Sequence, residues 1–135
     1  MEVKHGRGYV YAIEYHIVWC VKYRRKVLDS EMAVLLKELL IETAIKYNFK
    51  IESLEVVSDH VHVLVSASPQ HSIPEMVKVL KGISARKLFL AFPRIKKQLW
   101  GGHLWNPSYF VATISETTEV QVKKYIASQN APEVL

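Results

Sequence analysis

Residues 60–66 read His-Val-His-Val-Leu-Val-Ser, and the fold of the chain can be worked out from this stretch. Side chains along a β-strand point alternately to its two faces. The three valines therefore share one face, while His60, His62 and Leu64 share the other. This alternation predicts a strand whose valine face lies on a hydrophobic core, so that both histidines point to the opposite face.

Three other segments are predicted to be strands. Residues 51–57 and 109–115 are two of them. Residues 9–21 alternate throughout, with His16 on one face and an apolar row on the other that consists of Tyr9, Tyr11, Ile13, Tyr15, Ile17, Trp19 and Val21. A period of two over this length predicts a single strand that is half covered by a core.

Two helices are predicted between these strands. Asp29 or Ser30 can cap a helix that spans residues 30–47 and carries an apolar stripe. Ser72 and Glu75 are spaced as a capping box, which opens a second helix after the His60 strand.

The end of the chain adds a long loop over residues 94–107 and a last helix over about residues 118–129, capped by Thr117. The order is then β-α-β-β-α-β followed by one helix. This order predicts an α+β fold of ferredoxin-like or RRM-like type, with a four-stranded antiparallel sheet and both crossover helices on one face. The fold alone indicates no function, because it serves many.

Length and composition set limits on the class of protein. The chain has 135 residues, of which 50% are hydrophobic and 23% charged, so we expect one globular domain over residues 1–135. Cys20 is the only cysteine, which excludes an intrachain disulfide. We find neither an apolar run of about 18 residues nor a signal peptide, and therefore expect a cytoplasmic protein with no membrane partner.

Positive charge is concentrated in one region. The net charge is +5, and residues 76–115 hold seven lysines and arginines but no acidic residue. This distribution is typical of nucleic-acid binding, although a solvated helix face with a basic loop would also produce it. The residues that we expect to contact DNA phosphates here are Arg86, Lys87, Lys96 and Lys97.

Two further groups are candidate DNA contacts. Trp105 lies in the basic region and would stack on unpaired bases, unless it pins the loop by being buried. Arg24, Arg25 and Lys26 would hold a DNA hairpin by its phosphates, unless they form a solvated turn.

The paired histidines suggest a metal site. Imidazoles at positions i and i+2 of one strand face lie side by side and can hold a divalent ion with a third ligand from elsewhere. Many strands expose such a pair without using it, so His60 and His62 alone leave the question open.

The last helix supplies a possible nucleophile. Tyr125 and Gln129 are four residues apart and share a helix face, and Lys123 and Lys124 precede them. A tyrosine here is more often a half-buried anchor of the helix. A phenol is a poor nucleophile, but a metal ion held by two histidines and an amide oxygen would polarise a phosphodiester for it, and the lysines would steer DNA to it.

Several motifs resemble one family of enzymes. His60-Val61-His62 resembles the His-hydrophobe-His motif of the HUH endonucleases, and Tyr125 with Gln129 one turn later resembles their single-tyrosine transposase branch. Residues 16–26 (HIVWCVKYRRK) and 101–110 (GGHLWNPSYF) are also similar to that branch. The chain is identified on these motifs as a member of the insertion-sequence 200/605 group, the IS200-like transposases.

The resemblance implies a mechanism. A Mg²⁺ or Mn²⁺ ion on His60, His62 and Gln129 contacts the scissile phosphate of single-stranded DNA, and Tyr125 attacks the phosphorus to form a 5′-phosphotyrosine. The strand is later rejoined by a 3′-hydroxyl. The DNA is expected to contain subterminal hairpins, and the protein to be a homodimer whose tyrosine helix can complete the partner's histidine pair. The strand pattern, and not the resemblance, gives His16 a role: if the first and third strands are neighbours, it lies near His60 and His62 and would support them.

Three alternatives remain at this stage. A ferredoxin-like module that binds single-stranded nucleic acid without cutting it would explain the charge and the fold. An HUH nuclease that processes chromosomal palindromes would keep the same residues without mobility. A small metal-dependent phosphatase would use the metal ion without needing Tyr125.

Overall fold

The computed structural model describes residues 3–6, 9–11, 13–99, 102–113 and 118–129. The elements in chain order are β1 (Lys4–Gly6), β2 (Tyr9–Tyr11), β3 (Glu14–Cys20), the 3₁₀ turn η1 (Lys22–Arg24), α1 (Ser30–Lys46), β4 (Lys50–Val57), β5 (His60–Ser66), α2 (Ile73–Ala91), α3 (Ile95–Gln98), β6 (Phe110–Thr113) and α4 (Thr118–Ser128). None of the helices described is long and apolar enough to cross a membrane.

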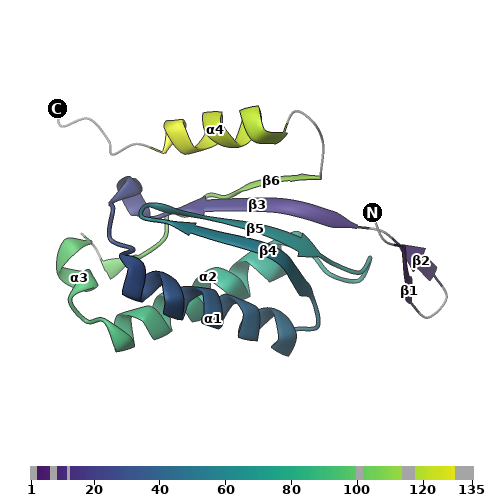
Figure 1. The fold of residues 1–135 in the computed structure, drawn as a ribbon, viewed down its shortest axis with the longest axis horizontal. Coiled ribbons are helices and arrows are strands. Elements are labelled where there is room, and N and C mark those ends of the chain that lie inside the picture. Colours follow the sequence, from purple (N-terminus) through teal and green to yellow (C-terminus); the bar gives the residue numbers. More distant parts are fainter. Residues whose placement is uncertain (1–2, 7–8, 12, 100–101, 114–117, 130–135) are drawn as a thin grey trace.

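The main sheet has four antiparallel strands in the order β4-β5-β3-β6. Helices α1 and α2 cover one face, and α4 lies over the other (Figure 1). This arrangement confirms the predicted α+β fold of ferredoxin-like type with an added helix that carries Tyr125. Strands β3 and β5 are neighbours, which places His62 opposite Val18.

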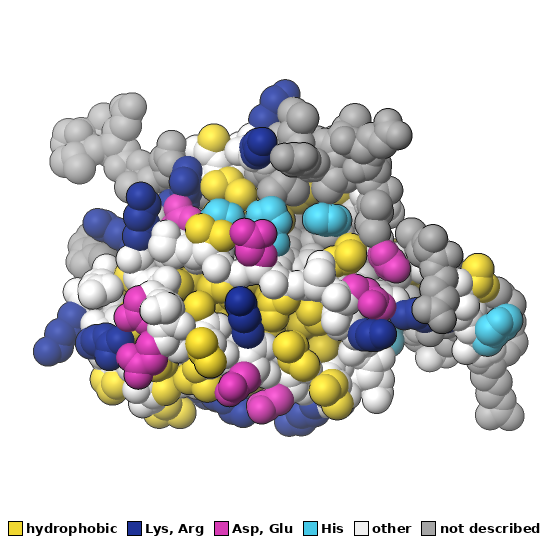
Figure 2. Space-filling model, in the orientation of Figure 1, with side chains coloured by type: hydrophobic (Ala, Val, Ile, Leu, Met, Phe, Trp, Pro, Cys, Tyr) yellow, Lys and Arg dark blue, Asp and Glu magenta, His cyan; other side chains and the backbone are white. Residues whose placement is uncertain are grey.

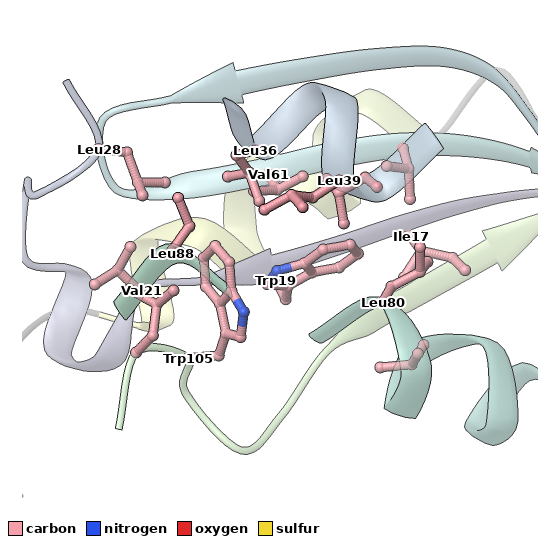
Figure 3. Packing of buried hydrophobic residues seen from close by; sticks show 14 of the residues in the cluster. Ile17, Trp19, Val21, Leu28, Leu36, Leu39, Val61, Leu80, Leu88 and Trp105 are labelled. Atoms are coloured by element: carbon pink, nitrogen blue, oxygen red, sulfur yellow. The ribbon is translucent and has the colours of Figure 1, made fainter. Parts of the chain in front are cut away.

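The hydrophobic core lies between the sheet and the first two helices. Val61, Val63 and Val65 of β5 are at most 1% exposed, as their alternation predicts. Leucines of α1 and α2 pack against them, together with Trp19 of β3 (Figure 3). His60 and His62 point to the opposite face and remain partly exposed.

Local capping residues begin the first two helices as expected. The Asp29 carboxylate accepts a hydrogen bond of 2.9 Å from the backbone N–H of Met32. Ser72 Oγ accepts one of 3.2 Å from the backbone N–H of Glu75. Both bonds satisfy N–H groups that have no partner within the first turn of a helix.

The single strand predicted over residues 9–21 is wrong. β2 pairs with β1 in a separate two-stranded sheet, whereas β3 pairs with β5 and β6. Alternation continues in phase across both strands, so periodicity does not reveal the break between them. The predicted Thr117 cap and the last two residues of the predicted strand 109–115 lie outside the described residues.

The predicted loop over residues 94–107 also contains structure. Helix α3 forms within it, and its first residue, Ile95, is completely buried. Beyond α3, Trp105 forms an isolated bridge with Val21 at the end of β3.

Trp105 belongs to the core, which corrects its prediction as a base-stacking residue. Only 7% of it is exposed, and its ring meets Trp19 edge to face with centroids 5.9 Å apart (Figure 3). Its indole N–H donates to Ser84 Oγ and to the carbonyl of Lys81, each at 3.1 Å. A buried ring with a satisfied N–H anchors the loop to α2 and offers no face to a base.

Trp105→Ala is therefore expected to lower the free energy of unfolding by about 3–5 kcal/mol, the usual cost of removing a large aromatic ring from a core. Urea unfolding followed by circular dichroism measures this change. A loss below about 1 kcal/mol combined with weaker DNA binding would restore the base-stacking interpretation.

Candidate active site on the open sheet face

The two histidines lie side by side on the sheet face toward α4. Their ring centroids are 5.2 Å apart, with the ring planes tilted by 54°. The register places His60 opposite Cys20 of β3, and His62 between Val18 of β3 and Glu55 of β4. Figure 2 shows histidine side chains gathered between the sheet and α4, with acidic side chains next to them.

His60 is held by a carboxylate that sequence analysis missed. Its Nδ1 lies 2.7 Å from Oδ1 of Asp59, which is only 4% exposed. Burial alone would raise the pKa of Asp59, but its bonds to His60 and to Arg24 outweigh this and lower the pKa below its usual value. The available signal was a carboxylate directly before the histidine pair, although an aspartate in a two-residue turn has an ordinary structural explanation.

Arg24 connects Asp59 to α4 through two hydrogen bonds. Its Nε donates to Asp59 Oδ2 at 2.8 Å, and one terminal nitrogen donates to the carbonyl of Ile126 in α4 at 3.2 Å. We expect from sequence that Arg24 holds DNA phosphate, whereas these bonds commit its guanidinium to protein groups. Arg25 and Lys26 are exposed, and their predicted phosphate contacts stay predictions.

Tyr125 is half-buried against the β6 side of the sheet. Its hydroxyl lies 2.8 Å from Ser108 Oγ, and its ring centroid is 5.9 Å from that of Phe110. Burial raises the pKa of the phenol above its usual value, Ser108 opposes this shift through its hydrogen bond, and Cys20 adds to it. The phenol is therefore protonated at neutral pH.

Gln129 lies beside Tyr125 and binds the same loop. Its side-chain oxygen accepts hydrogen bonds from Asn106 Nδ2 and, at 3.3 Å, from Ser108 Oγ. No described hydrogen bond joins Gln129 to His60 or His62. Asn106 and Ser108 lie in the family-like segment 101–110, but sequence analysis gave neither residue a role, since nothing in the segment shows that it meets a helix about twenty residues later.

The residues present fit a divalent metal ion. Because Asp59 occupies His60 Nδ1, the other ring nitrogen is left for a ligand bond, as is usual for histidines that bind metals. Burial, followed by the charge of His60, lowers the pKa of His62, so this imidazole is neutral at neutral pH. The described residues contain no cluster of three or more His, Cys, Asp or Glu side chains. The third ligand expected from sequence is the amide oxygen of Gln129, and this stays a prediction.

His16 lies next to this pair, as expected from neighbouring strands. It lines a cavity of about 270 Å³ together with His62 and Glu55. Its Nδ1 is buried and has no hydrogen-bond partner among the described residues. A supporting role for His16 stays a prediction.

The predicted DNA contacts do not form one cluster. Lys123 and Lys124 are exposed on α4. Four further predicted phosphate contacts belong to α2 and α3 and are also exposed, namely Arg86, Lys87, Lys96 and Lys97. Since α2 and α4 lie on opposite faces of the sheet (Figure 1), one straight strand of DNA cannot meet all six residues.

Comparison with known families identifies the chain. The family model described as "Transposase IS200 like" matches residues 9–129, which include both histidines, Tyr125 and Gln129. The chain belongs to the IS200-like transposase family. It is accordingly a DNA-cleaving and strand-transferring enzyme of this family.

Individual relatives of this transposase agree with the assignment. It is 53% identical to the ISDra2 transposase TnpA of Deinococcus radiodurans over 98% of this chain and 95% of that protein. It is 29% identical to the transposase for insertion sequence element IS200 of Salmonella typhimurium over 86% of this chain and 76% of that protein.

Solved structures share the fold of this transposase. A crystal structure of a Deinococcus radiodurans R1 protein assigned as a transposase superposes with a TM-score of 0.91 at 52% identity, covering 96% of this chain and 99% of that one. A REP-associated tyrosine transposase bound to a REP hairpin has a TM-score of 0.57 at 16% identity, covering 89% of this chain and 67% of that one.

Proposed function

We propose that this transposase cuts and rejoins single-stranded DNA at hairpin-bearing ends, as a single-tyrosine HUH enzyme that forms a covalent 5′-phosphotyrosine on Tyr125. The observation that carries the proposal is that α4, which holds Tyr125, docks on the sheet face that presents His60 and His62. A nucleophile and a pair of side chains able to bind a metal ion on one surface suit a metal-assisted phosphoryl transfer.

A Mg²⁺ or Mn²⁺ ion would be held by His60, His62 and the amide oxygen of Gln129. When bound, the ion supplies Lewis-acid stabilisation of negative charge on the scissile phosphate. Asp59 fixes the orientation of the His60 ring through its 2.7 Å bond. Gln129 would exchange its bonds with Asn106 and Ser108 for this role.

The covalent step uses the phenol of Tyr125. Its oxygen forms a bond to phosphorus, the bond from phosphorus to the 3′-oxygen breaks, and the departing 3′-oxygen takes up a proton while the phenol loses one. Ser108 Oγ, 2.8 Å from the phenol oxygen, is the first group through which that proton can leave. The phosphodiester is conserved in the adduct, so attack by a 3′-hydroxyl reverses the step and reseals DNA.

The raised pKa of Tyr125 predicts a pH dependence. Between pH 7 and 9 nearly all of the phenol is protonated, so the rate of adduct formation is expected to rise about tenfold per pH unit if phenolate is the attacking form. Single-turnover rates at saturating DNA measure this.

One other group titrates in the same range. Burial lowers the pKa of Lys81 to about 8, and its ammonium donates to the carbonyls of Asn106 and Ser108. Lys81→Arg keeps the charge at all these pH values and serves as the control. If the rate of adduct formation stays constant over this pH range in both the wild type and Lys81→Arg, a group in the site removes the phenol proton during attack.

Hairpin recognition is proposed by analogy with the REP-associated transposase, which shares the fold and is bound to a hairpin. Exposed basic residues of this chain would supply the phosphate contacts, namely Arg25, Lys26, Arg86, Lys87, Lys96, Lys97, Lys123 and Lys124. Phosphate contacts of this kind make binding weaken as salt concentration rises.

The function is tested by incubating the protein with labelled single-stranded hairpin DNA and Mg²⁺, followed by a denaturing gel. A labelled band of protein mass that requires Mg²⁺ supports the proposal. Retarded DNA on a native gel without this band would indicate a binding module, and cleavage without a covalent band would indicate a phosphatase-like hydrolase. An adduct formed only with chromosomal palindromes would indicate a non-mobile nuclease.

Excision of an element requires two cuts, and each chain offers one Tyr125, so we propose a homodimer in which α4 can serve the partner's histidine pair. Mixing Tyr125→Phe with His60→Ala distinguishes shared from separate sites. Shared sites restore adduct formation, because one composite site in each heterodimer is intact. No restored activity, in a mixture that light scattering shows to be dimeric, would place each site within one chain.

A further inference from the structure

The Asp59 carboxylate joins two parts of the molecule. One of its oxygens is 2.7 Å from His60 Nδ1, and the other is 2.8 Å from Arg24 Nε. Its side chain is 5% exposed, so water does not compete for these oxygens. Charge-assisted hydrogen bonds of this length in a buried position are strong and directional. Movement of either His60 or Arg24 therefore shifts the carboxylate, and through it the other side chain.

Arg24 continues this connection to the helix of the nucleophile. A terminal nitrogen of its guanidinium donates to the carbonyl of Ile126, the residue after Tyr125. Ile126 lies in the last turn of α4, where carbonyls lack the usual helical partner and the helix dipole favours a positive charge. The same carbonyl also accepts from the backbone N–H of Gln129, the residue that follows α4, so the contact of Arg24 lies between Tyr125 and Gln129.

The backbone at Tyr23 and Arg24 has an uncommon conformation, which places the Arg24 side chain for these contacts. Tyr23 and Arg24 have φ angles of 58° and 53°, a left-handed conformation that is uncommon for residues other than glycine. The turn is closed by a 2.7 Å bond from the backbone N–H of Arg24 to the carbonyl of Val21. Two successive residues in this conformation persist only where surrounding contacts impose it.

We propose that Arg24 is a positioning residue that links the orientation of His60, through Asp59, to the docking of the helix that carries Tyr125. The continuous path His60–Asp59–Arg24–Ile126 consists of three direct hydrogen bonds of 2.7, 2.8 and 3.2 Å. The proposal rests on the proposed function, because it assigns His60 to the metal site and Tyr125 to the chemistry. It replaces the phosphate contact expected from sequence with a contact that joins the two halves of the site.

Only an arginine suits this position. Its guanidinium offers divergent N–H groups in a rigid plane, so one edge can bind a carboxylate while another nitrogen reaches a carbonyl. A lysine ammonium in this place can keep the charge beside Asp59, but its shorter reach from a single nitrogen does not satisfy both acceptors.

The sharpest test changes Asp59, which makes no described hydrogen bond to α4, and measures amide hydrogen exchange in α4. In metal-free Asp59→Asn, amide hydrogen exchange in α4 is expected to be about tenfold faster than in the wild type, because Arg24 loses the charged partner that aims it. His62→Ala is the matched control, since it removes the other histidine without touching Asp59 or Arg24, and it should leave exchange in α4 unchanged.

The second test changes Arg24 itself and compares it with its neighbour. Arg24→Gln is expected to speed exchange in α4 by about tenfold, to weaken Mn²⁺ binding severalfold, and to slow adduct formation at saturating DNA, while changing the Kd for hairpin DNA less than twofold. Arg25→Gln removes the same charge one residue away and should weaken only hairpin binding. Arg24→Lys should behave like Arg24→Gln in α4 exchange.

Three outcomes would overturn the inference. Unchanged exchange in α4 of Asp59→Asn would break the link through the carboxylate. Weaker hairpin binding by Arg24→Gln with unchanged α4 exchange would make Arg24 a phosphate contact. Faster exchange in β3 and β5 as well as in α4 would make it a support of the whole fold. Failure of the proposed function is separate: the wild type would then bind no Mn²⁺ and form no adduct, whereas the exchange measurements need neither.

Discussion

Tyr125→Phe is expected to fold and bind hairpin DNA as the wild type does, yet to form no covalent adduct. The phenyl ring keeps the contact with Phe110 and loses only the hydroxyl that bonds to Ser108. Removal of a catalytic nucleophile typically lowers the rate by a factor of about 10³ or more. Adduct formation on labelled single-stranded DNA, scored on a denaturing gel, measures the effect.

Mapping the modified peptide by mass spectrometry decides whether Tyr125 is the nucleophile. Tyr23 is the fair control residue, since it lies beside basic residues in η1 and directly before Arg24. Tyr15 and Tyr109 pack against the hydrophobic core and are poorly placed to reach DNA. A phosphotyrosine at any of these positions, or an adduct formed by Tyr125→Phe, would show that the nucleophile is another residue.

Replacing either histidine of the pair is expected to abolish cleavage and to leave hairpin binding nearly intact. His60→Ala and His62→Ala each remove one of the two proposed histidine ligands, and the described residues contain no cluster of three or more His, Cys, Asp or Glu side chains that could hold the ion instead. Binding survives because phosphate contacts elsewhere supply most of the affinity for DNA. Cleavage and Mn²⁺ binding are measured in parallel on EDTA-treated protein.

His103→Ala is the matched control for these variants, because His103 is exposed in the loop before Trp105 and belongs to neither half of the site. It should cleave DNA as the wild type does. Cleavage by both His60→Ala and His62→Ala in the presence of EDTA would remove the basis of the metal assignment.

The parts of the fold that sequence predicted correctly depend on neighbours along the chain. The alternation in residues 60–66 reports which side chains face the core, because a strand keeps its period of two wherever it is placed. Asp29 and Ser72 cap helices by bonding N–H groups three residues ahead, so their spacing already contains the interaction. The order of strands and helices along the chain predicted the ferredoxin-like fold, whereas the neighbourhood of the first and third predicted strands, β3 and β5, was only a condition until the structure showed it.

The parts that sequence did not predict depend on contacts between distant residues. Trp105 has the same local surroundings whether it stacks on bases or fills a core, and the deciding partners, Ser84 and Trp19, are remote in sequence. Asp59 resembles a turn residue until Arg24, 35 positions earlier, is seen to bind it. The histidine pair and Tyr125 were recognised as separate motifs, but the bonds of Asn106 and Ser108 to α4 could not be read from either.

The single thiol of the chain lies where these contacts meet. Cys20 is completely buried, and Asp59, Arg24, Lys81 and Tyr125 are all close enough to influence its pKa or to be influenced by it. Burial, reinforced by Asp59, raises the pKa of Cys20 to about 11, so it is an unreactive thiol in the docked state. An alkylating reagent can therefore reach Cys20 only after the residues that bury it separate. The rate at which the reagent labels this sulfur then measures how often this part of the active site opens in solution.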